Sequence, residues 1–296
     1  MINSIIRILV IFFSVNISAQ DYLQDLLSAP SSNPLITNTF KSTRVINNHS
    51  VEIFNPGHLD FRVAHRFGRL NSGVYNLYGL DQATMRIGLE YGLINNVMIG
   101  LGRSTYNKTI DGWIKYRLLH QSSGEKSIPI SIVGFSSMEI NTLQKDIVMN
   151  ILNNDMKYPF SGRLSFCHQI LIASKINRNF SLQLMPAWVH FNMVEYRSDA
   201  NDIFIFGLGA RCLITRRISI NSEYFFRFFN QSEIFVDRYV NSFSIGVDIE
   251  TGGHVFQLHL TNSLPMYESG FMTQTEGSWG SGAVHFGFNI SREFNL

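Results

Sequence analysis

The last segment of the chain alternates strictly between two kinds of side chain. In residues 281–294, even positions carry large apolar side chains such as Phe286 and Phe288, apart from Arg292, and odd positions carry small or polar ones such as Gly287 and Asn289. Successive side chains of an extended chain point to opposite faces, so the segment predicts a strand with one apolar and one polar face. A strand that is apolar outside, polar inside and closes the chain is typical of an outer-membrane β-barrel.

The same alternation recurs along most of the chain. It is regular in residues 59–67, 82–91, 97–102, 111–118, 163–172, 180–188, 204–214, 218–228, 242–250 and 256–261, and less clean in residues 128–135. Charged residues make up only 16% of the chain, against roughly 25% in soluble domains. The charges gather on one face of most segments, and the other face is rich in aromatic residues. This pattern predicts an all-β fold with a lipid-facing wall and a polar lumen.

The connections between these segments differ in length in a regular way. Tight turns at residues 95–96, 177–179, 215–217 and 251–253 are interspersed with longer loops at 139–159, 194–202, 230–238 and 263–279. A soluble sandwich also alternates along its strands, but short periplasmic turns and long external loops are typical of a membrane barrel. The count predicts a transmembrane antiparallel β-barrel of about 12 strands. The alternative is 14 strands, since residues 43–53 could add a strand although their alternation is poor.

The first 56 residues do not follow the barrel pattern. Residues 1–19 carry one positive charge, a short apolar run and small residues before the expected cleavage site, which predicts a signal peptide and export to the cell outer membrane. Residues 20–56 are then expected to form a periplasmic lead-in or a plug segment, and residues 57–296 the barrel itself.

Several phrases of the sequence resemble one known family. They are NPGHLDFR at residues 55–62 with HRFG at 65–68, GLDQAT at 79–84, DGWIK at 111–115 and TGGHVFQLH at 251–259. Together they resemble a Bacteroidota outer-membrane β-barrel family, domain of unknown function 5777. The resemblance covers most of the mature chain and implies a barrel in the outer membrane. It implies no catalytic or ligand-binding residues.

Charged residues on the polar faces are the main candidate site. Those expected to form a charged network in the lumen are Arg62, Arg66, Arg86, Glu90, Asp111, Lys115, Arg117, Arg163, Arg211, Glu223, Arg227, Asp248, Glu250 and Glu293. Charges in a narrow lumen must be paired or hydrated. They could therefore form a salt-bridged plug or line a conduit for a small solute or ion. Both signs occur in near balance, which favours the plug.

Other candidate chemistry is weaker. His259 and His285 could approach each other if the last two strands form a hairpin, but a metal site would need a third ligand such as Asp248 or Glu250. The spacing favours hydrogen-bonded histidines, so the sequence predicts no metal and no cofactor. It contains no Gly-x-Ser-x-Gly, His-Glu-x-x-His or phosphate-loop motif, and we expect no enzyme. No basic patch or motif indicates nucleic-acid binding.

Two function classes remain open from the sequence. The first is a narrow, plugged or weakly conducting barrel that handles small solutes. The second is a non-transporting structural or adaptor barrel that docks a periplasmic or membrane protein partner through its loops or N-terminal segment. The external loop at residues 263–279 is rich in aromatic residues and methionine, so it could form an interaction surface or fold into the mouth. Outer-membrane lipid is the expected surrounding in both classes.

Overall fold

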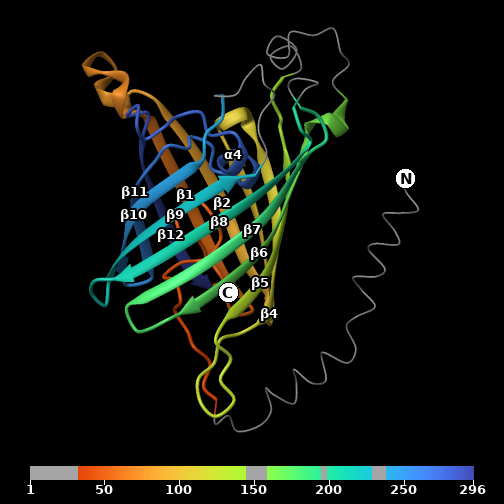
Figure 1. Cartoon of the computed structure of the whole chain (residues 1–296), viewed down its shortest axis with the longest axis vertical. Coiled ribbons are helices and arrows are strands. Elements are labelled where there is room, and N and C mark those ends of the chain that lie inside the picture. Colours follow the sequence, from red (N-terminus) through yellow and green to blue (C-terminus); the bar gives the residue numbers. More distant parts are fainter. Residues whose placement is uncertain (1–32, 145–158, 195–198, 229–237) are drawn as a thin grey trace.

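Twelve antiparallel strands close into one barrel (Figure 1). A computed structural model describes residues 33–144, 159–194, 199–228 and 238–296. The strands are β1 (His58–Arg69), β2 (Ala83–Ile94), β3 (Val97–Ser104), β4 (Ile110–Leu119), β5 (Ser131–Ile140), β6 (Leu164–Lys175), β7 (Phe180–Phe191), β8 (Asp202–Leu213), β9 (Ile218–Arg227), β10 (Ser242–Thr251), β11 (His254–Thr261) and β12 (His285–Asn295). The predicted 12-stranded barrel is confirmed, and residues 43–53 add no strand to the wall.

The C-terminal strand closes the barrel by pairing with the first strand. Leu59 on β1 lies opposite Phe294 on β12, and Val63 lies opposite Ile290. Each strand also pairs with its neighbour in sequence, so the backbone donors and acceptors of the wall are satisfied around the whole circle. The expected signal peptide at residues 1–19 lies outside the described residues.

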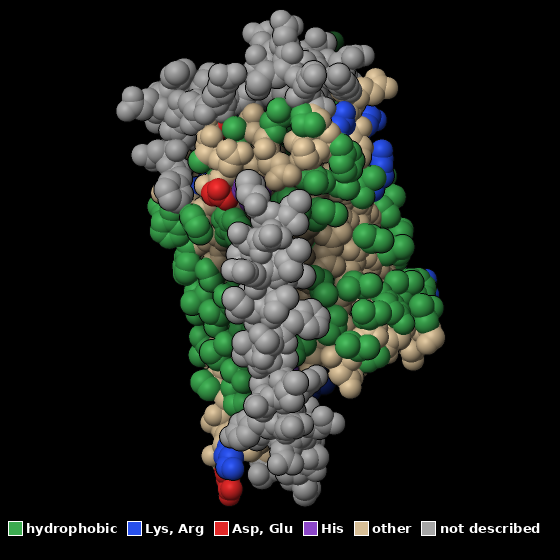
Figure 2. Space-filling model, turned by 90° about the vertical axis from the view of Figure 1, so that its right-hand side faces the viewer, with side chains coloured by type: hydrophobic (Ala, Val, Ile, Leu, Met, Phe, Trp, Pro, Cys, Tyr) green, Lys and Arg blue, Asp and Glu red, His purple; other side chains and the backbone are tan. Residues whose placement is uncertain are grey.

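The wall presents alternate side chains to its two faces. Phe61, Leu89 and Leu101 point outward and are exposed, whereas Arg62 and Glu90, the next residues along β1 and β2, are buried inside. Figure 2 shows hydrophobic side chains over the wall, with most of the visible charged side chains toward its ends. In the described part of the chain, no helix is long and apolar enough to span a membrane.

β5 differs from the strand expected at residues 128–135. It begins at Ser131 and ends at Ile140, so Glu139 lies on the strand and is buried, not in an external loop. Val133 and Phe135 face inward while Ile132 faces outward, which makes both faces apolar here. The inward-facing side chains pack in an apolar cluster inside the barrel. Because these inward positions are apolar like the outward ones, the sequence of β5 does not alternate between apolar and polar residues.

Short helical elements lie at the end of the barrel that carries the longer loops. They are the 3₁₀ elements η1 (Leu70–Ser72), η2 (Val74–Gly79), η3 (Tyr106–Lys108) and η4 (Phe160–Arg163), and the α-helix α4 (Glu268–Thr273). Figure 1 shows α4 at this upper end, inside the ring of strands, and the short turns at the lower end. All six residues of α4 are buried, so the β11–β12 loop folds into the mouth.

Candidate functional site

The chain before β1 enters the barrel from the short-turn end and fills its interior. Ile36 N–H donates to Gln121 O at 2.8 Å and Lys175 Nζ donates to Thr37 O at 2.9 Å, which fastens the entry point. We call residues 39–52 the inner segment. Most of its residues are buried, although no wall strand pairs with it.

The inner segment reverses direction at its tip. Ser50 N–H donates to Thr43 O at 2.8 Å, and Val45 N–H donates to Asn48 O at 2.8 Å. Residues 43–50 therefore form a hairpin, held by two backbone hydrogen bonds and surrounded by inward-facing side chains. A hairpin of two short legs is marginal in water, so its position must come from contacts with the wall.

Two charged side chains of the wall each bind three backbone groups of the inner segment. The Glu223 carboxylate on β9 accepts hydrogen bonds from three successive N–H groups, those of Ile46 at 3.3 Å, Asn47 at 2.9 Å and Asn48 at 3.1 Å. On the other side, Lys115 Nζ on β4 donates to three carbonyls, those of Thr43 at 3.3 Å, Ser50 at 2.9 Å and Glu52 at 2.8 Å. Hydrogen bonds to charged groups are the strong ones in a buried setting. These contacts fix the hairpin between opposite walls of the barrel.

Uncharged amides on other strands complete the backbone contacts. Gln257 Nε2 on β11 donates to Val45 O at 3.1 Å, and Asn289 Nδ2 on β12 donates to Ile46 O at 3.0 Å. On β7, Gln183 binds the second leg twice, since its Nε2 donates to His49 O at 2.8 Å and its Oε1 accepts from Val51 N–H at 3.0 Å. Buried peptide groups without a partner are costly, and here the wall supplies the partners.

Two of the arginines that the sequence analysis expected in the lumen also bind the chain inside the barrel. Arg117 Nη2 donates to Val51 O at 3.1 Å. Arg211 Nη1 donates to two carbonyls near the entry, Asn38 O at 2.9 Å and Thr39 O at 3.1 Å. Both guanidinium groups therefore face a part of the chain that lies inside the barrel.

The other side of the hairpin packs against apolar and aromatic residues. The His49 ring lies 4.4 Å from the Trp113 ring and 4.4 Å from the Phe135 ring, measured between centroids. His49 is fully buried, and burial lowers its pKa well below the ordinary value, with the Arg44 guanidinium lowering it further. The interior is thus a packed core, charged toward β1–β4 and β9–β12 and largely apolar along β5–β8.

Replacing Gly100 by Ala should overpack this part of the interior and destabilise the folded barrel. A methyl group at Gly100 on β3 would lie 2.3 Å from the Trp113 ring, which is buried and rests on His49. Overpacking of this kind costs about 1–3 kcal/mol. Urea unfolding in lipid vesicles, followed by tryptophan fluorescence, measures the change. Gly134→Ala is the control, because its methyl group would come no nearer than 3.9 Å to Tyr116 O, and equal loss in both variants would contradict the packing shown here.

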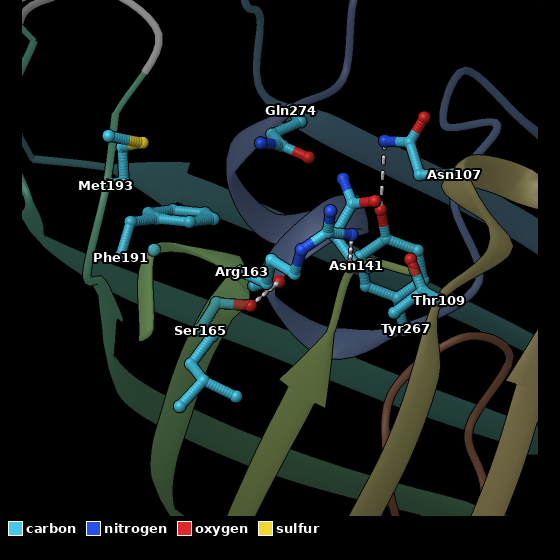
Figure 3. Close-up of a pocket in the computed structure, with 12 residues that line it drawn as sticks. Asn107, Thr109, Asn141, Arg163, Ser165, Phe191, Met193, Tyr267 and Gln274 are labelled. Atoms are coloured by element: carbon cyan, nitrogen blue, oxygen red, sulfur yellow. Dashed lines mark hydrogen bonds between the residues drawn. The ribbon is translucent and has the colours of Figure 1, made fainter. Parts of the chain in front are cut away.

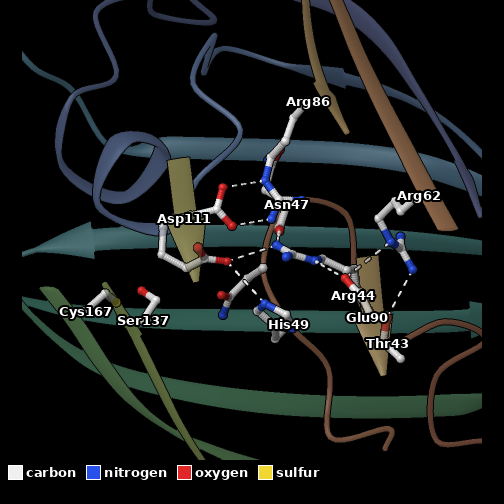
Figure 4. A network of polar contacts seen from close by, with 12 residues as sticks. Thr43, Arg44, Asn47, His49, Arg62, Arg86, Glu90, Asp111, Ser137 and Cys167 are labelled. Atoms are coloured by element: carbon white, nitrogen blue, oxygen red, sulfur yellow. Dashed lines mark hydrogen bonds and ion pairs between the residues drawn. The ribbon is translucent and has the colours of Figure 1, made fainter. Parts of the chain in front are cut away.

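A second group of charges joins the hairpin to α4 (Figure 4). Arg44 Nη1 donates to Glu268 Oε1 at 2.9 Å, and His49 Nε2 lies 3.3 Å from the same oxygen. Burial raises the pKa of the Glu268 carboxyl, and the Arg44 charge acts in the opposite direction. At the other end of this contact, Ser269 N–H donates to Glu139 Oε1 at 3.2 Å. The mouth loop and the inner segment therefore meet inside the barrel.

Ion pairs on β1, β2 and β4 surround the same point. Arg86 binds Asp111 through two nitrogens, with Nε 2.9 Å from Oδ1. Glu90 lies 3.4 Å from Arg44 Nε and 3.6 Å from Arg62 Nε, measured from its Oε1. All of these side chains are almost fully buried. Of the remaining predicted lumen residues, Arg66 binds Asn47 Oδ1 and Asp248 accepts a hydrogen bond from Gln257.

Four predicted residues lie apart from this buried network. Glu250 pairs with Lys41 and Glu293 pairs with His58, and the two carboxylate side chains are 44% and 41% exposed. Both pairs therefore belong to the rim, where the gain from an ion pair is small.

The other two residues belong to the long-loop end. Arg163 is the last residue of η4, and its guanidinium donates to Asn141 O at 3.1 Å and Leu143 O at 2.6 Å. Arg227 ends β9 and lies over the Tyr239 ring at 5.7 Å. Neither contacts the hairpin in the described structure.

The two candidate histidines lie on neighbouring strands but two positions apart. His259 on β11 is opposite Gly287, and His285 on β12 is opposite Thr261. His285 Nδ1 donates to Phe67 O at 2.8 Å. Across the described ranges, no three His, Cys, Asp or Glu side chains are grouped so that they could hold a metal ion.

Arg44, Asn47, His49, Glu139 and Glu268 were not predicted as site residues. The first three lie in a segment without regular alternation of apolar and polar residues, so the direction of their side chains could not be predicted. The last two lie in segments that were expected to be external loops. The available signal was indirect. Charged and amide side chains such as those of β4, β7 and β9 needed buried partners, and no sequence pattern said that backbone groups would supply them.

A small polar pocket opens beside α4 (Figure 3). Its volume is about 110 Å³, and Asn107, Asn141, Arg163, Tyr267 and Gln274 are among the residues that line it. Asn107 Nδ2 donates to the Tyr267 hydroxyl at 3.4 Å, so part of the polar lining is already paired within the protein.

Several solved structures are similar to this chain. The NanC porin aligns with 80% of this chain and 100% of its own, at 7% identity and a TM-score of 0.47. The KdgM porin in complex with disordered oligogalacturonate aligns with 80% of this chain and 99% of its own, at 7% identity and a TM-score of 0.47. LpxR from Salmonella typhimurium aligns with 81% of this chain and 100% of its own, at 10% identity and a TM-score of 0.36.

No curated protein matches the sequence. A family model described as "Membrane bound beta barrel domain (DUF5777)" matches residues 40–294, which include the hairpin and all twelve strands except the last residue of β12. The resemblance to domain of unknown function 5777 is therefore confirmed, and the chain belongs to the DUF5777 family of membrane-bound β-barrels.

Proposed function

We propose that the protein is an outer-membrane β-barrel that its own N-terminal segment keeps closed, and that it passes small polar solutes only when the hairpin at residues 43–50 is displaced. The wall supports this proposal because its outer face is apolar and its inner face carries charges of both signs. The proposal includes no catalytic step, metal or cofactor.

The observation that carries the proposal is the set of contacts around the hairpin tip. Glu223 accepts three backbone N–H groups and Lys115 donates toward three carbonyls, so the wall is complementary to this segment in particular. Removing the segment would leave both charges buried without partners unless water replaced it. A barrel built to stay open would have solvated charges and no need of such a fit.

Planar-bilayer recording of the full-length protein tests the resting state. We expect no steady current steps at low voltage, because the inner segment and α4 both occupy the lumen. Denaturant at a concentration that leaves the wall folded should then produce steps as the hairpin leaves, since the hairpin is held by fewer hydrogen bonds than the strands. Steady steps in untreated protein at low voltage would contradict the closed state.

A specific observation favours a second candidate, the non-transporting adaptor. The lumen is occupied from both ends, by the inner segment and by α4, and the two are joined through Arg44 and Glu268. Such a barrel resembles a solid core and could serve only to present its surfaces to a partner. Conduction by a variant that lacks the hairpin separates this candidate from the gated barrel.

A further inference from the structure

The loop between β1 and β2 exposes an unusual amount of apolar surface. Val74 is 72% exposed and Tyr75 is 94% exposed, and Leu77, Tyr78 and Leu80 are each about half exposed. No residue from 70 to 80 is charged. Figure 1 shows this loop as the orange knob that stands clear of the barrel at the upper left, at the long-loop end.

The loop is held in this form by its own hydrogen bonds. Tyr78 N–H donates to Gly73 O at 2.9 Å and Leu80 N–H donates to Leu77 O at 3.1 Å. Leu77 and Tyr78 both have positive φ angles, 45° and 53°, which are unfavourable for residues with a Cβ. Gly79 packs so closely on Gly68 that a methyl group at Gly79 would lie 2.5 Å from its backbone. The apolar side chains are therefore presented by a folded loop.

Further contacts hold the loop against the rim. Leu70 N–H donates to Val284 O at 2.8 Å, and Asn71 Nδ2 donates to Ser281 O at 2.9 Å. These bonds fasten the start of the loop to the last part of the β11–β12 connection. The apolar residues that follow are left on the outer side and do not share in the cover of the lumen.

The exposed surface continues the lipid-facing wall. Phe67, two residues before the end of β1, stacks on Phe286 of β12 at 5.8 Å between ring centroids. The outward aromatic face thus runs close to the end of β1 and β12. The uncharged knob begins just after the exposed Arg69, which pairs with Glu276 of the β11–β12 loop. Tyrosine beside aliphatic residues is the composition found where a membrane protein crosses the headgroup region.

We infer that residues 74–80 insert into the headgroup region of the outer leaflet and anchor the barrel rim to lipid. Exposed apolar patches on a folded protein mark an interaction surface. Continuity with the wall identifies lipid as the occupant, because the same membrane already covers Phe67 and its neighbours. The inference does not depend on whether the lumen conducts.

Depth-dependent quenching tests the inference. Tyr75→Cys is labelled with bimane in a Cys212→Ser background, since Cys212 is exposed on the wall and Cys167 is buried. The full-length barrel is reconstituted into phosphatidylcholine vesicles that carry a spin label on a shallow acyl position. Matched controls are Leu101→Cys on the lipid-facing wall and Glu125→Cys in the exposed loop at the opposite end of the barrel.

The label at position 75 should lose most of its emission to the lipid quencher, as at Leu101, and should resist aqueous iodide. The label at Glu125 should do the reverse. If position 75 behaves like Glu125, the knob stands in water and the inference fails. Protection from both quenchers would also overturn it, since a second copy or another protein surface would then cover the loop. Val74→Cys repeats the test if the first variant does not fold.

Discussion

Deleting residues 43–50 is expected to turn a closed barrel into one that carries ion current. The deletion joins Ser42 to Val51, and the two legs already lie side by side, because Ser50 N–H donates to Thr43 O. The strand ladder is untouched, so the wall should still close. Glu223 loses all three of its peptide N–H partners and Lys115 loses two of its three carbonyl partners, so water must enter to solvate these charges. Planar-bilayer recording should then show resolved current steps where the intact chain shows none.

The control for this deletion is Lys41→Gln. Lys41 belongs to the same inner segment but pairs with the half-exposed Glu250 at the rim, so its loss should leave the lumen closed. Resistance of the unheated barrel to unfolding in SDS shows that both variants fold. A folded deletion variant that carries no current would contradict the gated barrel and favour the adaptor, with α4 as a sufficient seal.

Glu223→Ala is expected to release the hairpin without removing it. The three N–H groups of residues 46–48 would be left buried and unpaired. Each unpaired buried donor costs about 1–3 kcal/mol. A loss of about 3 kcal/mol in the free energy that favours the bound hairpin over the displaced one corresponds to roughly a 10²-fold rise in the population of the displaced hairpin.

Thiol labelling measures that population. A reporter is placed at Ser50→Cys, which is fully buried in the hairpin, and its modification by a water-soluble methanethiosulfonate is followed by peptide mass spectrometry. The rate should rise by roughly two orders of magnitude in the Glu223→Ala background. Asp248→Asn is the matched control, since this buried carboxylate accepts its hydrogen bond from Gln257 on β11. Equal labelling in the two backgrounds would mean that Glu223 does not hold the hairpin.

Much of the wall could be predicted because its physics is local. A strand in a barrel meets lipid on one face and the lumen on the other. The apolar Phe61 and the charged Arg62 are therefore predicted to lie on opposite faces without knowledge of the other strands. Alternating turn lengths then gave the even strand count. The rule failed at β5, where Val133 and Phe135 face an apolar part of the interior. As apolar residues, they cannot be distinguished in the sequence from lipid-facing residues.

The contents of the lumen could not be predicted in the same way. Residues 43–50 bind the wall mainly through backbone groups, which every sequence has, and their partners lie at sequence separations such as the 177 residues between Ile46 and Glu223. Likewise, nothing in the β11–β12 loop distinguished a helix inside the mouth from a surface outside it. Arg44 and Glu268 became partners only when both segments entered the barrel.

The sequence alone determined the closed membrane wall, because a period-two pattern is enough to say which side chains face lipid. Only the tertiary structure decided what occupies the interior, because a lumen is defined by strands that lie far apart in the chain. Hydrogen bonds between wall side chains and the peptide backbone of residues 43–50 leave no pattern of residue types from which they could be inferred.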